Sequence, residues 1–210
     1  MGSEMCIRDS DDPARGSRPF NRDREGFVLA EGCWMIILEE LEHAKKRGAN
    51  IVAELVGYGT TCDAYHRVAI MPDGKQSTRA LRLALKDART NEDEVDYINF
   101  HGTSTLINDK VETMAVKNTF NGKAINIPSS STKSMVGHPQ GASGALGVTV
   151  SALSLKNGFM TPTINMENPD PECDMDYISN VGREKRINVA ISNCISFGSK
   201  NSAIVLKRFE

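Results

Sequence analysis

The stretch that decides the fold is Ile98–Gly144, which contains two short histidine motifs. The motifs are HGTST at residues 101–105 and KSMVGH at residues 133–138. In each motif the histidine, His101 or His138, stands where a short apolar strand pattern gives way to a helix pattern. Two histidines at equivalent strand-to-helix corners predict a single site that is built from two loops.

Alternating strand and helix patterns extend from this stretch in both directions. Runs of apolar and β-branched residues predict strands at 27–29, 33–39, 51–58, 95–100, 125–128, 189–194 and 202–209. Apolar residues that recur every three or four positions predict helices at 39–47, 77–89, 109–118 and 141–152. This order predicts a layered α/β domain with a mostly parallel sheet, and it places both histidine loops at the carboxyl ends of strands.

Short connections and capping residues add local detail to this pattern. The strands 27–29 and 33–39 are expected to pair as a hairpin, with 33–39 buried. The last two strands of the chain are expected to be antiparallel, because their connection is too short for a crossover. Ser77 is expected to cap its helix, and Asp109 with Glu112 resembles a capping box.

Length and composition exclude several classes of protein. A chain of 210 residues, 40% hydrophobic and 25% charged, can bury the core of one large soluble domain. The net charge of −2 gives no reason to expect a nucleic-acid partner, and no window approaches the roughly 20 apolar residues of a membrane span. The five cysteines are scattered without a CxxC pair, which favours reduced thiols in a cytoplasmic protein. Residues 1–10 lack periodicity and an apolar signal core, so we expect a foreign leader there.

His101 and His138 have a chemical and a structural interpretation. As structural residues, each would be a strand-end histidine bonded to the backbone. As a pair, two neutral imidazoles can donate Nε2–H bonds to one carbonyl oxygen and stabilise an oxyanion or enolate. A desolvated histidine has a depressed pKa and stays neutral at pH 7, as that role requires. Metal binding by the pair is a further alternative, although no acid or cysteine stands nearby at ligand spacing and no cofactor fingerprint occurs, so no cofactor is expected.

Lys133 and Phe197 also have two interpretations each. Lys133 stands five residues before His138 and could tune a histidine, or it could be a solvated surface lysine. Asp109 and Glu112 could pair with Lys133 instead of capping a helix. Phe197 lies in a glycine-containing turn between two strands, where it is either a buried hairpin aromatic or a mobile gate over a pocket. No cysteine occupies a strand-to-helix elbow, so no nucleophile is evident.

Together these motifs resemble the C-terminal half of a β-ketoacyl-[acyl carrier protein] synthase of type I/II, and synthase II most closely. The resemblance covers roughly residues 10–209, and the separation of the two histidines (138 − 101 = 37) makes it highly specific. Further matching segments are at 17–20, 23, 26–29, 39–48, 53–57, 63–66, 162–165 and 168–170.

The resemblance implies a fold, an activity and partners. Such synthases have a thiolase fold with two similar α/β halves, each with a mixed five-stranded sheet, and they form homodimers. They elongate acyl chains in fatty acid biosynthesis by decarboxylative Claisen condensation of malonyl-carrier protein with an enzyme-bound acyl thioester. The implied partner is therefore an acyl carrier protein that carries acyl and malonyl groups on phosphopantetheine.

The resemblance also assigns roles to particular residues. His101 and His138 would bind the malonyl thioester carbonyl and assist decarboxylation, and Lys133 would support the second histidine. The substrate-binding residues that it implies are Thr103 and Thr105, which would meet the phosphopantetheine arm, and the gating residue Phe197.

Two features of the synthases have no counterpart here. The synthases are roughly twice as long as this chain, and their nucleophilic cysteine lies in the half that precedes this one. We therefore expect 11–48 to be the tail end of the N-terminal half and 49–210 to be the C-terminal domain, inactive alone because transthioesterification needs the absent thiolate. The alternatives are a non-catalytic subunit that resembles a chain-length factor, a polyketide pathway, and a thiolase-fold acyltransferase that uses coenzyme A. The motif pair argues against the last of these.

Overall fold

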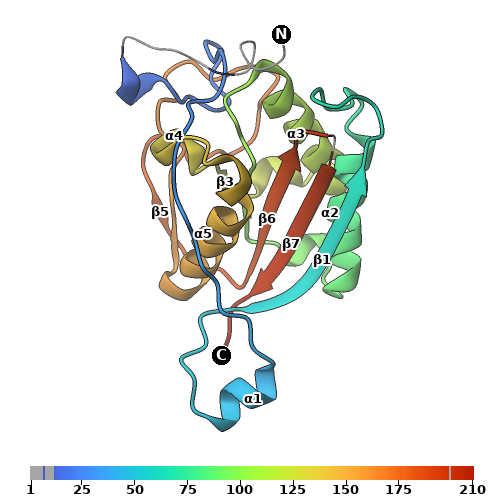
Figure 1. Cartoon of the computed structure of the whole chain (residues 1–210), viewed down its shortest axis with the longest axis vertical. Coiled ribbons are helices and arrows are strands. Elements are labelled where there is room, and N and C mark those ends of the chain that lie inside the picture. Colours follow the sequence, from blue (N-terminus) through green and yellow to red (C-terminus); the bar gives the residue numbers. More distant parts are fainter. Residues whose placement is uncertain (1–6, 8–11, 199) are drawn as a thin grey trace.

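A five-stranded sheet of mixed direction forms the centre of the protein (Figure 1). The structure is a computed structural model that describes Ile7, 12–198 and 200–210, so nearly all of the predicted leader at 1–10 lies outside the described residues. Strand β2 runs parallel to β3 and β6, whereas β7 is antiparallel to both of its neighbours, β6 and β1. In sheet order the strands are β1 (Glu54–Cys62), β7 (Lys200–Lys207), β6 (Val189–Ser196), β2 (Tyr97–Asn99) and β3 (Ser129–Ser130).

This arrangement confirms the mixed five-stranded sheet and corrects the prediction of a mostly parallel one. Two of the four strand pairs in the described sheet are antiparallel, and both involve β7. The antiparallel pairing of the last two strands is confirmed. The pairing that was not predicted is that of β7 with β1, because alternation of strands and helices does not indicate that the returning strand lies between β6 and β1. A second, small antiparallel sheet contains β4 (Phe159–Met160) and β5 (Arg183–Glu184).

Helices cover the two faces of the sheet. In Figure 1, α2 and α3 lie behind the sheet and α5 lies in front of it, whereas α1 extends beyond the sheet at the opposite end from the site. The helices are α1 (Leu41–Lys46), α2 (Lys75–Asp87), α3 (Leu106–Thr119), α4 (Lys133–Val136) and α5 (Ser143–Asn157). Short 3₁₀ turns lie at Pro13–Arg15, Glu92–Glu94, Ala124–Asn126 and Gln140–Ala142. No helix in the described part of the chain is both long and apolar enough to span a membrane.

Small residues let the helices approach the sheet closely. A Cβ atom at Gly59 of β1 would lie 2.1 Å from the carbonyl oxygen of Ala80 in α2. On the other face, a Cβ at Gly147 of α5 would lie 2.5 Å from the Ser192 Oγ of β6. Real side chains do not pack at such distances, so these glycines set how deeply both helices sit.

Residues 17–24 are anchored to α3 by a buried network. The Phe20 ring is fully buried and stacks on Tyr177, with ring centroids 3.8 Å apart. The Arg24 guanidinium is also buried and forms ion pairs with Asp170 at 2.6 Å and with Asp109 at 3.5 Å. A buried charge is tolerated only when it is paired and hydrogen-bonded. The N-terminal segment is thus part of the same folded body as the histidine loops.

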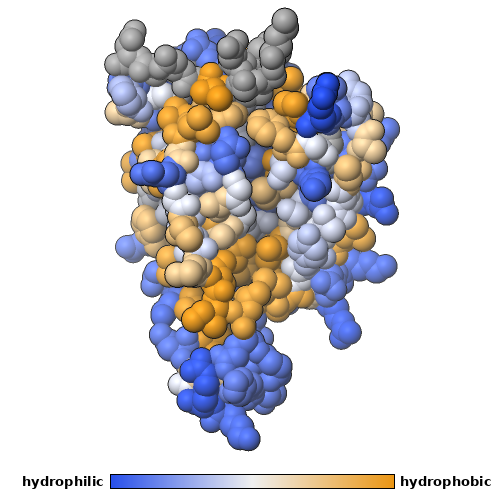
Figure 2. Space-filling view, in the orientation of Figure 1, coloured by the Kyte–Doolittle hydropathy of each residue, from blue (hydrophilic) through white to orange (hydrophobic). Residues whose placement is uncertain are grey.

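The predicted hairpin at 27–39 is wrong. Residues 30–40 form no strand, and the segment runs down the front of α5 towards α1 (Figure 1). Met35 is 92% exposed and Ile37 is 89% exposed, and Figure 2 shows apolar surface gathered on this face of the molecule. An apolar run indicates a side-chain preference for burial, but burial requires a facing surface, and the described chain offers this segment none.

Three boundary predictions also need correction. Ser77 is not a cap, because α2 begins two residues earlier, after Gly74, and the buried Ser77 hydroxyl donates to Asn201. The capping box of Asp109 and Glu112 is wrong as well, because Thr105 caps α3 and both acids lie inside the helix. The strand predicted at 125–128 is replaced by a 3₁₀ turn, and β3 begins only at Ser129. Pro128 immediately precedes β3, and it has no N–H to donate to a sheet ladder.

Candidate functional site

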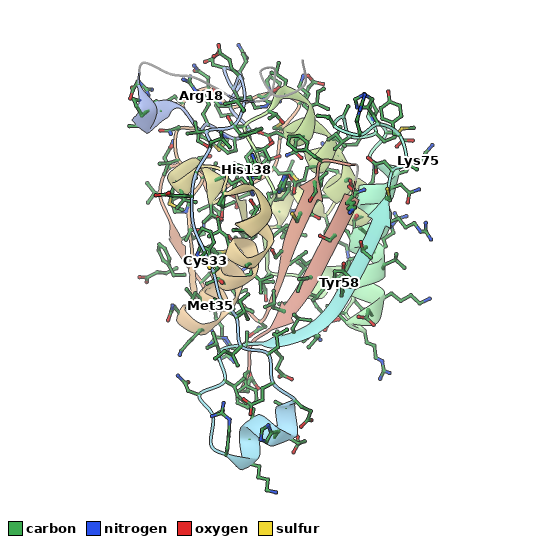
Figure 3. The ribbon with its side chains drawn as sticks, viewed as in Figure 1. Arg18, Cys33, Met35, Tyr58, Lys75 and His138 are labelled. Atoms are coloured by element: carbon green, nitrogen blue, oxygen red, sulfur yellow. The ribbon has the colours of Figure 1, made fainter. Side chains whose placement is uncertain are left out.

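The two histidine loops meet at one end of the sheet. The His101 and His138 ring centroids are 5.3 Å apart, and the ring planes are nearly perpendicular at 85°. Both side chains are buried, with 5% and 7% of their surface exposed. His138 lies at the same end of the molecule as Lys75, the first residue of α2 (Figure 3). Parallel strands β2 and β3 both end here, which is why residues 37 positions apart in sequence (138 − 101 = 37) become neighbours.

A glycine allows the first loop to turn immediately after His101. Gly102 has φ +38°, a backbone conformation that residues with a Cβ rarely adopt. A Cβ there would also lie 2.5 Å from the Ser131 Cβ. The Ser131 hydroxyl donates to the Gly102 carbonyl at 2.7 Å and so ties the loop after β2 to the loop after β3.

Glu112 fixes this turn from inside α3. Its carboxylate accepts the backbone N–H groups of His101 at 2.7 Å and Gly102 at 2.8 Å. It also accepts side-chain amide bonds from Asn193 at 2.6 Å and Asn108 at 3.3 Å. Burial raises the pKa of Glu112 to about 7, although these hydrogen bonds favour the ionised form. Glu112 therefore positions the His101 backbone, and sequence reasoning missed this role.

One sequence signal could have indicated this role. Asn108, Asp109, Glu112 and Thr113 recur at helical spacing and are all buried, so α3 turns a polar face inward. Several polar residues on the core-facing side of a helix must each find a partner. Here the partners are the HGTST turn and Arg24 rather than the helix's own first turn.

The hydrogen bonds of His138 define which of its two ring nitrogens carries the proton. Its Nδ1 accepts the backbone N–H of Gln140 at 3.2 Å and lies 2.9 Å from the Ser143 Oγ. Because a backbone N–H can only donate, Nδ1 is the acceptor and the neutral ring carries its proton on Nε2. Burial lowers the pKa of His138 to about 4, with a further contribution from the charge of Lys133. The edge contact with Phe27, at a centroid distance of 5.0 Å, closes one side of the ring.

His101 is also neutral at physiological pH. Burial lowers its pKa well below the usual value, and the charge of Lys133 acts in the same direction. The His101 Nδ1 has no hydrogen-bond partner among the described residues. The pair thus presents two uncharged imidazoles in a dry setting, where hydrogen bonds to a developing negative charge are strongest.

Lys133 is buried beside the histidines rather than solvated on the surface. Only 5% of its surface is exposed, and burial lowers its pKa, although the neighbouring Cys194 and Glu112 raise it. No carboxylate of the described residues lies within ion-pair distance of its ammonium, because Asp109 pairs with Arg24 and Glu112 binds amides. The alternative in which the two acids of α3 pair directly with Lys133 is therefore wrong.

Thr103 and Thr105 lie on the loop that follows His101. Their hydroxyl oxygens are 2.9 Å apart, and Thr105 also accepts the N–H of Asn108 as the cap of α3. Thr103 is buried, so its hydroxyl faces the interior of the loop rather than bulk water. The two hydroxyls thus contact each other on the loop that begins at His101.

Phe197 lies in the turn between β6 and β7, next to the same site. Its side chain is 51% exposed, which excludes the interpretation of a fully buried hairpin aromatic. Its ring centroid is 6.4 Å from that of Phe27, which in turn contacts His138. The following Gly198 has φ +79° and donates its N–H to the Arg67 carbonyl of the loop before α2. The turn is thus connected to both the site and a neighbouring loop.

The described residues near the histidines include no metal cluster, and the thiol closest to Lys133 is not activated. Cys33, Cys62, Cys173 and Cys194 are free, and Cys194, near Lys133, has a pKa that burial raises. A thiol with a raised pKa is a poor nucleophile. No three His, Cys, Asp or Glu side chains come together within the described chain as they would around a metal ion. The site contributes donors for a carbonyl oxygen, together with a buried amine.

Comparisons with known proteins point to one family. Residues 52–167 match the family described as Beta-ketoacyl synthase, C-terminal domain. A 3-oxoacyl-[acyl-carrier-protein] synthase 2 from Synechocystis sp. is 49% identical over 96% of this chain and 48% of its own length. The chain thus spans about half the length of this curated relative.

Two solved structures are similar throughout the chain. A type II polyketide synthase acyl-carrier protein in complex with its ketosynthase bound to the hexaketide gives a TM-score of 0.94 at 40% identity, covering 97% of this chain and 50% of that one. The ishigamide ketosynthase/chain length factor gives a TM-score of 0.89 at 38% identity, covering 96% and 48%. Both likenesses include the histidine site and the sheet that positions it.

Proposed function

Because the chain belongs to the β-ketoacyl synthase family and matches its C-terminal domain, we propose that it is the decarboxylating part of a 3-oxoacyl-[acyl-carrier-protein] synthase of fatty acid biosynthesis. The observation that carries this proposal is the pair of buried, neutral imidazoles 5.3 Å apart. Such a pair can hold one thioester carbonyl oxygen between two N–H donors.

The chemistry follows from where negative charge develops. When malonyl thioester loses carbon dioxide, the bond between the carboxylate carbon and the α-carbon breaks, and its electron pair forms an enolate on the thioester oxygen. The Nε2–H of His138 donates to that oxygen, and His101 supplies the second donor. Lys133 stays close enough to influence both histidines electrostatically without forming an ion pair. The enolate carbon then attacks the acyl thioester, and the thiolate that held the acyl group leaves.

Substrate delivery involves the loop hydroxyls and the β6–β7 turn. Thr103 and Thr105 carry two hydroxyls on the loop that follows His101, and these would bind the amide groups of a phosphopantetheine arm. Phe197 is half exposed beside Phe27 and would open or close the way to His138. The partner that carries the arm is an acyl carrier protein, as in the related ketosynthase complex.

The proposal includes a second half for the active protein. Segment 33–39 is apolar but exposed, which suits a strand whose facing surface belongs to a preceding half. We assign 11–48 to the end of that half and 49–210 to the C-terminal domain, and we expect the whole protein to be a cytoplasmic homodimer. The preceding half would supply the thiolate that accepts the acyl group, so this chain alone should not condense substrates.

A non-catalytic subunit that resembles a chain-length factor is the second candidate. This candidate is kept because one of the similar solved structures is the ishigamide ketosynthase/chain length factor. The two candidates differ at the residue that occupies the strand-to-helix elbow of the preceding half. A cysteine there supports the synthase, whereas a glutamine or another residue without a thiol supports the partner subunit.

The experiment joins this chain to the preceding half of its own gene product. The joined protein is incubated with an acyl-carrier protein thioester, and the mass of the protein reports whether the acyl group is transferred. Malonyl-carrier protein is then added, and formation of the 3-oxoacyl product is measured. Acyl transfer followed by condensation supports the synthase. Decarboxylation of the malonyl group without acyl transfer supports the decarboxylation site but contradicts the synthase, and the absence of both reactions contradicts the proposed function and supports the non-catalytic subunit.

A further inference from the structure

The hydroxyl of Ser143 lies 2.9 Å from the Nδ1 of His138, on the opposite edge of the ring from Nε2. Ser143 is the first residue of α5 and only 6% of its surface is exposed, so water does not compete for this contact. We propose that Ser143 is a positioning residue that holds His138 in the tautomer with its proton on Nε2. This inference rests on the proposed function, because it explains how His138 keeps an N–H directed towards a substrate oxygen.

The direction of this hydrogen bond follows from the second contact of the same nitrogen. The Gln140 backbone N–H points at Nδ1 from 3.2 Å, and a backbone N–H cannot accept. A proton on Nδ1 would therefore face another hydrogen. The Ser143 hydroxyl can rotate, so it donates to the same lone pair at the shorter of the two distances. Both donors stabilise the ring with a bare Nδ1.

The groups that surround the ring reinforce this state rather than compete for Nδ1. Lys133 of α4 and His101 of the neighbouring loop are the titratable groups around the ring. Lys133 disfavours a charged His138 imidazole through its own charge, and His101 is itself neutral. Phe27 contacts the ring with its edge and offers no hydrogen bond. Ser143 is thus the only described side chain that hydrogen-bonds Nδ1.

The loop geometry shows why a side-chain donor is needed. Gln140 has φ +48° and lies in a single 3₁₀ turn, Gln140–Ala142, so its N–H is presented by a short and strained segment. Ser143 is fixed at the start of a 15-residue helix that packs against β6. A hydroxyl on a rigid element holds the imidazole orientation better than one backbone N–H on a tight turn.

The test is nuclear magnetic resonance of the 15N-labelled 210-residue chain without substrate. Long-range proton–nitrogen spectra at pH 7 report which ring nitrogen of His138 carries the proton. We expect Nε2 to be protonated and Nδ1 to be bare in the wild-type chain. In Ser143→Ala, the Nδ1 resonance should move towards that of an unbonded nitrogen. The pKa of His138 should also rise by roughly 0.5 to 1, since one stabilising bond to the neutral ring is lost.

Matched variants separate positioning from general packing. Ser143→Thr keeps the hydroxyl and should restore both signals, while Ser143→Cys, a weak donor, should give intermediate values. Ser151→Ala removes a buried hydroxyl two turns later in α5 that has no partner among the described residues, and it should leave both signals unchanged. If Ser143→Ala does not fold, the threonine and cysteine variants alone order the signals by donor strength.

Three results would overturn the assignment. The first is a wild-type His138 with its proton on Nδ1. The second is a pKa that falls in Ser143→Ala, which would mean that the hydroxyl accepts from a charged ring. The third is that all Ser143 variants give the same Nδ1 resonance and the same His138 pKa as Ser151→Ala. The spectra need no substrate and no preceding half, so their failure is separate from a failure of the proposed decarboxylation.

Discussion

The backbone N–H of His101 donates to the Glu112 carboxylate at 2.7 Å, and this buried contact sets where the first histidine stands. The two residues are eleven positions apart (112 − 101 = 11), the first at the end of a strand and the second two turns into the following helix. The carboxylate therefore joins β2 and α3 directly beneath the site. Glu112 does not take part in the proposed chemistry, but its carboxylate holds the backbone of His101 in position.

Replacing Glu112 with glutamine should destabilise the protein by about 2–3 kcal/mol at pH 8. A carboxylate accepts bonds at both oxygens, whereas glutamine would turn an N–H towards either His101 or Gly102. The free energy of unfolding in urea measures the loss. Glu172→Gln is the matched control, because Glu172 pairs with Lys110 at an exposed position and should cost less than about 1 kcal/mol. Equal costs for the two variants would contradict the positioning role.

Replacing Gly102 with alanine should cost about 1–3 kcal/mol and displace the first histidine loop. The backbone there has φ +38°, and the added Cβ would lie 2.5 Å from the Ser131 Cβ. Gly141→Ala is the control, since Gly141 has open space around it and no positive φ. Thermal unfolding of both variants checks this, and a Gly102 variant as stable as the Gly141 variant would refute the packing argument.

His138 should make stability fall as the solution becomes acidic. Its folded pKa of about 4 lies below the unfolded value, so its contribution is complete above pH 6.5 and is lost as pH falls from 6.5 to 4. The pKa difference of about 2.5 corresponds to at most about 3.4 kcal/mol. Glu112 has the opposite sign, because its raised pKa makes its contribution complete below pH 4.5 and lost as pH rises to about 7.

The variant His138→Gln isolates the histidine contribution from that of Glu112. Urea unfolding at a series of pH values between 4 and 8 should show wild-type and variant curves that diverge as pH rises from 4 to 6.5. The variant should keep the decline towards pH 7 that Glu112 causes and the loss at acidic pH that the lowered pKa of His101 causes. Parallel curves across this range would show that His138 is not held neutral by the fold.

The histidine corners could be predicted from sequence because strand and helix periods change at His101 and His138. Because β2 and β3 are parallel neighbours, their carboxyl ends, and with them the two histidine loops, lie at the same edge of the sheet. The role of Glu112 could not be predicted in the same way. Thr105 and Asp109 are both residue types that cap helices, and only the fold decides that Thr105 does so and that the later acids turn inward.

The segment 33–39 shows a different limit. Its apolar run correctly indicates residues that favour burial, yet Met35 and Ile37 are almost fully exposed in this chain. Periodicity reports what a side chain prefers and not which surface will cover it. The same limit applies to Ser143, whose hydroxyl matters only because a single 3₁₀ turn carries His138 back to the start of α5.

Decarboxylation of malonyl-carrier protein by the chain joined to its preceding half tests the central claim most directly. The measurement is release of carbon dioxide by the wild type, His101→Ala, His138→Ala and the control His43→Ala, whose side chain is exposed on α1. Each site variant should lose at least about 100-fold in rate, as for removal of an oxyanion donor, while the His43 variant keeps the wild-type rate. Undiminished rates in both site variants would contradict the proposed decarboxylation site.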